Sequence, residues 1–352
     1  MSNDDCAAAS DYRVDICDSE GSLQVLISEW LTLWRASTHS TPFQSPYWNL
    51  AWWRHLKYGG ALAVITLRHL GKLVGLAPWR LSNNCGRQVL SFIAAGVTDC
   101  LDMLWLPGYE ARSVQIILRE IEHQSYCDEY DFDELSADSP LINAAGFTAH
   151  ATRGEVCPVL VLPGPDGLNG GISPAAIRRL GYYRRRLARN HKYQVLSANP
   201  ENINYLLAEL LRIHHELWSA RGQAGVLCGK DIADFHREAA TALLREGVLR
   251  MYLLRIDDCS AAVFYGFQWH QRTYYYLGGY APEFEHLNPG TLVIGHAIDC
   301  AIREGSREFN FLRGRESYKY WWGARDRFNY RLRIPLTSIP APVNGDDLNP
   351  RP

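Results

Sequence analysis

The groups that could perform chemistry are concentrated in one stretch of this sequence, residues 272–322. Within it, an aromatic run ending at Tyr280 is followed by Asn288-Pro289-Gly290-Thr291 and then by an apolar segment. Asparagine is a favoured N-cap and proline suits the first helical turn, so we expect a helix to begin here. The first N–H groups of a helix are free and lie at the positive end of its dipole. The start of this helix is therefore a predicted phosphate or pyrophosphate site.

Two adjacent glycines interrupt the aromatic run before this helix. Paired glycines are uncommon inside a strand and favour a bulge or a splay of the strands, so Gly278 and Gly279 are candidates to free a backbone N–H group. A free N–H group at this position could polarise a carbonyl, as an oxyanion hole does. The alternative is that the glycines only make room for the bulky neighbours Tyr276 and Tyr280.

Polar residues follow the next expected strand, at residues 307–314. We assign Arg313 to the binding of a cofactor, and Glu316 to the role of a base or of a partner for an ammonium group. Tyr318 opens the short helix that follows. The alternative is that Glu316 caps this helix while Tyr318 closes a core together with Trp321 and Trp322.

Two carboxylates in the first half of the chain, Asp99 and Asp102, follow the third of three expected strands. Paired carboxylates could bind a cationic amine or act as a base, although aspartates also serve in turns and helix caps. A basic run between the halves could contact an anionic ligand or be a solvated helix surface. This run contains Arg178, Arg179, Arg184, Arg185, Arg186, Arg189 and Lys192.

Two halves with the same order of elements must position these residues. The second half is predicted to have strands at 193–197, 249–256, 261–270, 272–280, 307–314 and 328–334, and helices at 202–221, 232–246 and 288–304. The first half repeats this order with strands at 12–17, 61–69, 73–81, 89–95 and 132–136, and helices at 23–35, 47–57 and 111–125. A Gly/Pro-rich stretch at 163–173 separates the halves.

The predicted fold is α+β, with two duplicated domains at 12–165 and 174–336, mixed central sheets flanked by helices, and a flexible tail at 340–352. The first-half counterpart of the phosphate-binding loop, residues 96–108, is acidic and apolar. We therefore assign the substrate to the first half and the cofactor to the second.

Composition gives no argument for a polyanionic partner, because the net charge is −2 and 47% of the residues are hydrophobic. Nine cysteines without a C-x-x-C pair favour reduced thiols in a cytosol. No signal peptide is visible, and no apolar run approaches the roughly 20 residues of a membrane span. No metal site is predicted, because Ser219 stands where a zinc-protease motif starting at His215 needs its second histidine.

Several motifs together resemble the GNAT-like acyltransferases described as CelD-like, or cellulose-biosynthesis-associated, which are related to the FemAB tandem-GNAT group. The resemblance spans roughly residues 20 to 335. The motifs are Thr41-Pro-Phe-Gln-Ser-Pro-Tyr-Trp, Leu73-Val-Gly-Leu-Ala-Pro, Thr98-Asp-Cys-Leu-Asp, His214 with Trp218 and Arg221-Gly222, Pro289-Gly290, and Phe309-Asn-Phe-Leu-Arg-Gly with Glu316, Tyr318 and Lys319.

The resemblance implies a bacterial cytosolic acyltransferase whose site lies near the cleft between two GNAT-like domains. It implies acetyl-CoA or another acyl-CoA as co-substrate, an amine acceptor such as an amino sugar or polysaccharide precursor, and Tyr318 as the acid that protonates the departing thiolate. Two alternatives stay open at this point. One is a FemAB-type transferase that uses aminoacyl-tRNA, and the other is a non-catalytic accessory protein of polysaccharide assembly.

Overall fold

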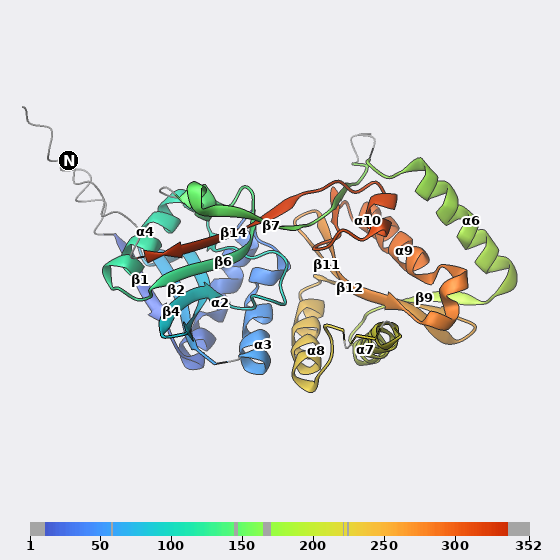
Figure 1. Ribbon diagram of the computed structural model, residues 1–352, viewed down its shortest axis with the longest axis horizontal. Coiled ribbons are helices and arrows are strands. Elements are labelled where there is room, and N and C mark those ends of the chain that lie inside the picture. Colours follow the sequence, from blue (N-terminus) through green and yellow to red (C-terminus); the bar gives the residue numbers. More distant parts are fainter. Residues whose placement is uncertain are drawn as a thin grey trace, which may run out of the picture.

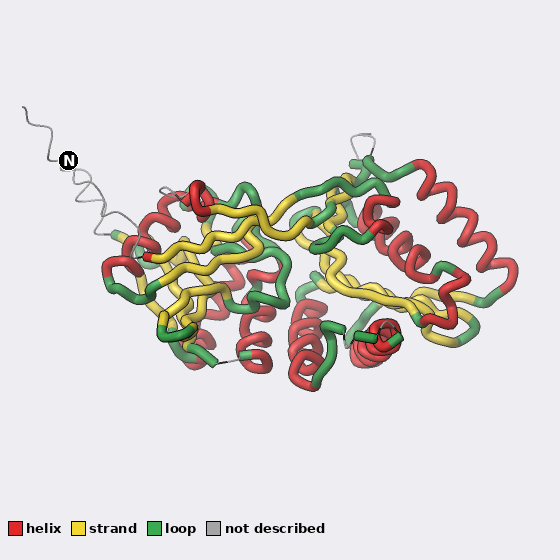
Figure 2. Tube along the Cα trace, in the orientation of Figure 1, coloured by secondary structure: helices red, strands yellow, loops and turns green. Residues whose placement is uncertain are grey.

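The computed structural model describes residues 11–57, 59–143, 147–164, 170–220, 222–223 and 225–336. The predicted tail at 340–352 and Arg221 lie outside the described residues. Two sheets lie side by side along the long axis of the molecule, and helices cover them (Figures 1 and 2). The mixed α/β architecture with two duplicated sheets agrees with the predicted fold class.

The first sheet has eight strands in the order β1-β2-β3-β4-β6-β14-β7, with β5 paired to β3. Its strands are β1 (Tyr12–Cys17), β2 (Ala61–His69), β3 (Lys72–Asn84), β4 (Arg87–Phe92), β5 (Leu104–Trp105), β6 (Glu129–Ser136), β7 (Ala151–Val156) and β14 (Phe328–Pro335). The helices of this half are α2 (Glu20–Ala36), α3 (Pro46–Leu56), α4 (Glu110–His123) and α5 (Pro140–Asn143).

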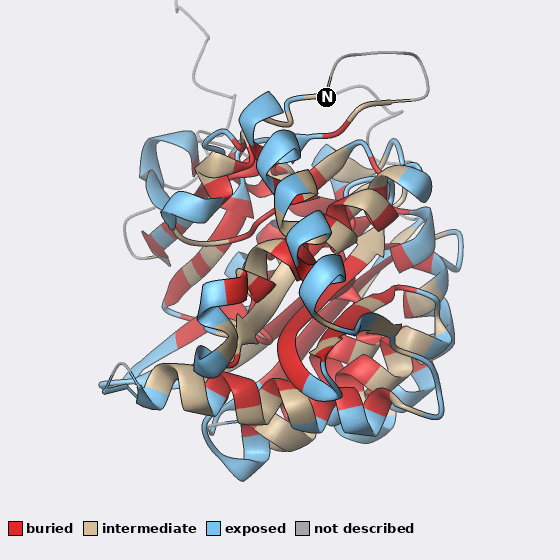
Figure 3. Cartoon of the chain, turned by 90° about the vertical axis from the view of Figure 1, so that its right-hand side faces the viewer, coloured by how far each residue is buried: buried red, intermediate tan, exposed pale blue. Residues whose placement is uncertain are grey.

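The second sheet has six strands in the order β8-β13-β12-β11-β10-β9. They are β8 (Val159–Val161), β9 (Tyr193–Ser197), β10 (Leu249–Ile256), β11 (Cys259–Trp269), β12 (Arg272–Tyr280) and β13 (Glu308–Asn310). The helices are α6 (Pro174–Asn190), α7 (Ile203–Ser219), α8 (Lys230–Arg245), α9 (Pro289–Arg303) and α10 (Ser317–Trp321). Helices with exposed outer faces cover largely buried strands at this end of the molecule (Figure 3).

The two halves exchange their last strands. β8 comes from the end of the first half but pairs with β13 of the second sheet, whereas β14 from the end of the chain pairs with β6 of the first sheet. The red arrow of β14 accordingly lies among strands of the first half in Figure 1. β8 runs antiparallel to β13, which runs parallel to β12. In the same way, β14 runs antiparallel to β6, which runs parallel to β4. Each sheet therefore contains one strand from the other side of the predicted boundary at 165–174. The division into two domains at this boundary stays a prediction.

Alternating side chains place the helices of the second half on opposite faces of its sheet. Val263 and Tyr265 pack in one core with α7 and α8, and Ala262 and Phe264 pack in another with α9. Successive side chains of a strand point to opposite faces, so α9 lies on one face and α7 and α8 lie on the other. This separation matters because the site described below draws residues from both faces.

An aromatic interface joins the two halves. The core that contains α7 and α8 also contains residues of α2 and α3, and α3 packs against α8. Trp34 stacks on Trp269 with 3.9 Å between ring centroids, and the Tyr276 hydroxyl donates to the Val97 carbonyl at 2.7 Å. Burial of this much aromatic surface holds the halves in a fixed relative position.

Candidate functional site

The second sheet splits where β13 ends. β12 pairs with β11 over its whole length, but it pairs with β13 only from Arg272 to Tyr274. The observed β13 is shorter than the predicted strand at 307–314, because the Asn310 side chain accepts the Leu312 N–H at 2.8 Å and Leu312 adopts a positive φ of 55°. The part of β12 from Tyr275 to Gly279 therefore has no neighbouring strand among the described residues on the side that β13 leaves.

A bulge lies in β12 next to this edge, at a different residue from the one predicted. The register shifts between Tyr265 and Gly266, opposite Tyr276, whereas Gly278 and Gly279 pair regularly with Phe264 and Val263. The bulge therefore lies at Tyr276 and not at the glycines, whereas the splay expected there is present, because β13 leaves β12 after Tyr274. A side chain at Gly278 would lie 2.5 Å from the Tyr275 hydroxyl, so this glycine provides space for Tyr275, and not for the Tyr276 and Tyr280 named in the alternative.

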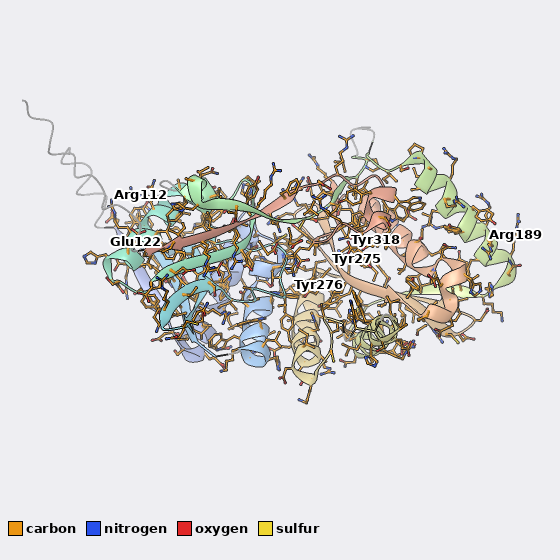
Figure 4. All side chains as sticks on the ribbon, viewed as in Figure 1. Arg112, Glu122, Arg189, Tyr275, Tyr276 and Tyr318 are labelled. Carbon is orange, nitrogen blue, oxygen red and sulfur yellow. The ribbon has the colours of Figure 1, made fainter. Side chains whose placement is uncertain are left out.

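A cavity of about 740 Å³ opens at the split. From the face of α9 it is lined by Val293, Ile294, Tyr275, Phe311 and Tyr318, and from the opposite face by Tyr276, Leu217, Ile232, His214 and His236. Gly278, Gly279, Gly290 and Thr291 also line it. Figure 4 shows Tyr275, Tyr276 and Tyr318 together near the middle of the molecule. The cavity thus connects the two faces of the sheet through the gap between β12 and β13.

The first turn of α9 lies at this cavity, as predicted for the phosphate site. Pro289 is the first residue of the helix, and Leu292 is the first to donate back to Asn288, at 3.2 Å. Gly290 and Thr291 find no backbone acceptor among the described residues, so their N–H groups remain available to an anion. The predicted side-chain cap is wrong, because Asn288 adopts the left-handed conformation and its side chain makes no capping hydrogen bond.

An ion cluster forms one end of the cavity. The Arg313 guanidinium pairs with Asp99, and it contacts Glu134 at 3.2 Å. The amide of Asn329 donates to the Asp99 carbonyl and to the Glu134 carboxylate, both at 2.7 Å. Arg313, assigned from the sequence to the cofactor, therefore neutralises two buried carboxylates of the first half. Burial raises the pKa of Asp99 and raises that of Glu134 to about 7.

Lys319 fixes the segment that follows β13. Its side chain is 3% exposed, and its Nζ donates to the carbonyls of Leu312 and Gly314 at 3.2 Å and to Glu316 at 2.9 Å. Glu316 is the N-cap residue of α10, as the structural alternative held, although its side chain makes no capping hydrogen bond. Burial of its hydroxyl raises the pKa of Tyr318 well above its ordinary value, which keeps the phenol protonated.

Two buried histidines on the wall opposite α9 complete the site. His214 on α7 and His236 on α8 are each 2% exposed and line the cavity. Neither imidazole has a hydrogen-bond partner among the described residues, and the Nδ1 of His236 is buried. His236 was not singled out, although a polar residue on the buried face of α8 was a usable signal.

Two groups of predicted site residues lie elsewhere. Asp102 does not line the cavity; its carboxylate accepts the Met103 N–H at 2.9 Å, and burial raises its pKa to about 7. The basic run forms α6, none of whose arginines line the cavity, and Arg189 lies at the far end of the molecule in Figure 4. Arg184 pairs with Asp299 at 2.6 Å.

In the first sheet, the position equivalent to this cavity lies beside β4 and β6, and residues of the loop after β4 fill it. The Leu101 N–H donates to the Glu134 carbonyl at 3.0 Å, and Leu101 and Met103 are buried beside β4 and β6. These residues belong to the loop that the sequence indicated as a poor pyrophosphate site. The first half instead contributes Gly96, Val97 and Asp99 to the cavity of the second half.

Comparisons with known proteins agree with this geometry. Residues 175–320, less than half of the chain, match the protein family described as "Acetyltransferase (GNAT) domain". The structure of FemX is similar with a TM-score of 0.61 and 10% identity, over 87% of this chain and 95% of FemX. No curated protein sequence matches the chain.

Two further solved structures share the fold. The C-terminal domain of a putative lysylphosphatidylglycerol synthetase from Agrobacterium fabrum has a TM-score of 0.56 and 10% identity, over 88% of this chain and 91% of that domain. A conserved protein of unknown function from Bacteroides thetaiotaomicron has a TM-score of 0.56 and 11% identity, over 91% of this chain and 99% of that protein. At such identities the similarity concerns the fold alone.

Residues 175–320 thus match a GNAT acetyltransferase domain, and the chain as a whole shares its fold with FemX. The more specific likeness to CelD-like proteins stays a prediction. None of the described helices has the length and apolar character to span a membrane. Within the described ranges, His, Cys, Asp and Glu side chains do not group in threes in a way that could hold a metal ion.

Proposed function

We propose that this protein is an N-acyltransferase that transfers an acyl group from acyl-CoA, either acetyl-CoA or a longer relative, to an amine such as a glycan precursor. The observation that carries the proposal is the cavity that crosses the sheet between β12 and β13. Such a passage allows two substrates to enter from opposite faces and meet in the middle. Bringing them together in the correct orientation is itself a large part of catalysis.

The residues on the α9 side fit an acyl-CoA. The free N–H groups of Gly290 and Thr291 would hold its pyrophosphate, and the unpaired edge of β12 would pair with the amide groups of its pantetheine arm. A side chain at Gly290 would lie only 3.4 Å from the Tyr280 ring, so the backbone here is closely approached. Gly278 and Gly279 line the same path and keep it free of side chains.

Three side chains are placed to handle the protons of the reaction. When bound, acyl-CoA supplies a thioester whose carbonyl carbon is open to attack by an amine. Asp99 and Glu316 are the carboxylates that line the cavity, and we assign to them the binding and deprotonation of the amine. Tyr318 lines the cavity on the cofactor side, and its retained proton makes it the acid for the leaving thiolate.

Calorimetric titration with acetyl-CoA and longer acyl-CoAs tests the proposal, with Gly290→Glu as the informative variant. The glutamate would bring negative charge and bulk to the second residue of α9, where the phosphates are expected. Gly21→Glu is the matched control, because Gly21 is the second residue of α2 and a side chain there meets nothing within 4 Å.

We expect micromolar binding that Gly290→Glu abolishes and Gly21→Glu preserves. If no acyl-CoA binds the wild-type protein, the proposal is wrong. The aminoacyl-tRNA alternative would then be tested first, since exposed arginines of α6, including Arg178 and Arg185, form no ion pair within the described part of the chain.

A further inference from the structure

The wall of the cavity opposite α9 differs in chemistry from the rest of the site. It is built by α7, α8 and the segment between them, and its lining residues are Leu217, Trp218, Val226, Leu227, Ile232 and the two histidines His214 and His236. None of these seven residues carries a formal charge when the imidazoles are neutral. The charged residues that line the cavity, among those described, are Asp99, Arg313, Glu316 and Lys319. They all lie near the ion cluster or α10.

Among the described residues, neither imidazole has a hydrogen-bond partner. His236 packs among aromatic rings, with centroid distances of 4.7 Å to Phe235 and 5.7 Å to Tyr265 and to Tyr276. Its Nδ1 is buried and unpaired, and so is the Tyr265 hydroxyl. Buried polar atoms are nearly always satisfied, so the unpaired nitrogen of His236, a residue that lines the cavity, marks this imidazole as a candidate ligand contact.

The loop before α8 is shaped around the same histidines. Gly225 has a φ of +73°, and a side chain there would lie 2.5 Å from His214 Cε1 and 2.9 Å from Trp218 Cγ. The backbone of this loop therefore lies directly against the His214 ring. Packing against this backbone limits the orientations open to the His214 ring, which has no hydrogen bond to any described residue.

The cations of the cavity are not available to this wall. Arg313 is paired with Asp99 and Glu134, and Lys319 is bound by three backbone carbonyls and Glu316. An acceptor with a carboxylate or phosphate beyond its amine would find no unpaired cation here among the described lining residues. An acceptor with a second ammonium group would find no carboxylate on the α7–α8 wall. Neutral imidazoles, which both donate and accept, suit hydroxyl groups.

We propose that His214 and His236 form the acceptor subsite, and that the acceptor is an amine whose remaining part is uncharged and rich in hydroxyl groups, as in an amino sugar. This inference rests on the proposed acyltransferase function and names its acceptor class. The imidazoles bind hydroxyl groups from the face of α7 and α8. The amine is directed to Asp99 and Glu316, whose carboxylates have lone pairs left over beside their contacts with Arg313 and Lys319. The acyl donor enters from the face of α9.

The test measures acyl transfer from the acyl-CoA that binds most tightly to D-glucosamine, putrescine and glutamate. We expect glucosamine to have the highest kcat/KM. His236→Phe keeps the ring shape and removes both nitrogen atoms, so it should raise the KM for glucosamine roughly tenfold. The Kd for acyl-CoA should change less than twofold. Of His236→Asn and His236→Gln, which return an amide near Nδ1 or Nε2, at least one should recover part of the loss. His215→Gln, on the exposed residue next to His214, is the control.

A second pair of variants leaves the histidines in place. Gly225→Ala and Gly222→Ala both introduce a side chain at a φ of +73°, but only the former meets His214, since nothing lies within 4 Å of Gly222. Both should cost similar backbone strain, and only Gly225→Ala should raise the KM for glucosamine. Equal KM values in the two variants would count against the proposal.

The outcomes separate this inference from the function on which it rests. Absence of acyl-CoA binding to the wild-type protein would remove the acyltransferase function itself. Normal acyl-CoA binding with no transfer to glucosamine, or with preference for putrescine or glutamate, would overturn only the acceptor class. Tighter binding of octanoyl-CoA to His236→Phe, with unchanged glucosamine kinetics, would assign this wall to the acyl chain and overturn the subsite.

Discussion

Replacing His236 by phenylalanine should make folding of this protein less sensitive to acid. Burial lowers the pKa of His236 from 6.5 to about 3, and burial together with His215 lowers that of His214 to about 4. A group whose pKa is depressed in the folded state stabilises that state above its unfolded pKa, and this stability is lost as the pH falls toward the folded pKa. The relevant window for both histidines is therefore below pH 6.5.

The size of the effect follows from the pKa shift. One pKa unit corresponds to about 1.4 kcal/mol, so at pH 5 the unfolded chain gains about 2 kcal/mol for each histidine that stays neutral in the folded state. The wild-type protein should lose about 4 kcal/mol between pH 8 and pH 5 through this pair, and His236→Phe about 2 kcal/mol. Glu134 and Asp102, whose pKa values are raised to about 7, act in the opposite direction, but they do so equally in both proteins.

Urea unfolding at pH 8 and pH 5, followed by tryptophan fluorescence, measures this difference. At pH 8 the variant should be at least as stable as the wild-type protein, because phenylalanine removes an unpaired buried nitrogen from an aromatic core. His215→Gln should behave like the wild-type protein, since His215 is exposed on the same helix. The same loss of stability on acidification in wild-type and His236→Phe proteins would refute the claim that this imidazole is buried and neutral.

The remaining predictions concern the proposed chemistry and the ion cluster. Tyr318→Phe should lower kcat by about 100-fold without changing the Kd for acyl-CoA. Tyr320→Phe, on the same helix but not among the cavity-lining residues, should have little effect. A fall in affinity for acyl-CoA instead of in kcat would argue against an acid role for Tyr318. Arg313→Met should destabilise the fold by about 3 kcal/mol at pH 8, because Asp99 and Glu134 lose their buried counter-charge. The loss should be smaller at pH 6, because protonation of these carboxylates then relieves the cost. Arg331→Met, at a half-exposed pair with Asp131, should cost at most about 1 kcal/mol, so equal losses in urea unfolding would contradict the assigned burial.

The order of helices and strands could be predicted from the sequence because it depends on local patterns. Strands β1, β2, β9 and β12 have their predicted bounds, and α9 begins at the Pro289 that the sequence indicated. Hydrophobic periodicity and helix-start residues act within a few residues of chain, so they are readable without a fold. The duplicated order of elements can be read from the same local patterns. So can the difference between the phosphate-binding loop of the second half and its counterpart at residues 96–108.

The composition of the site was decided by contacts between distant residues. Asp99 and Arg313 are 214 residues apart, and Asn329 reaches Glu134 across 195 residues, so no local pattern could pair them. The bulge falls at Tyr276 and not at the glycines because it depends on the register between β11 and β12. The exchange of β8 and β14 likewise reflects which sheet edge each strand reaches in three dimensions.

The histidines show the same limit most clearly. His236 lies on the buried face of α8, but a buried histidine in a core and one beside a cavity have the same sequence signature. Only the tertiary structure shows that the β12–β13 split opens beside it and that no hydrogen-bond partner comes near among the described residues. The sequence by itself determined the elements and their order. Tertiary structure decided which polar groups are paired and which remain available to a substrate, because pairing depends on distances between elements and not on positions along the chain.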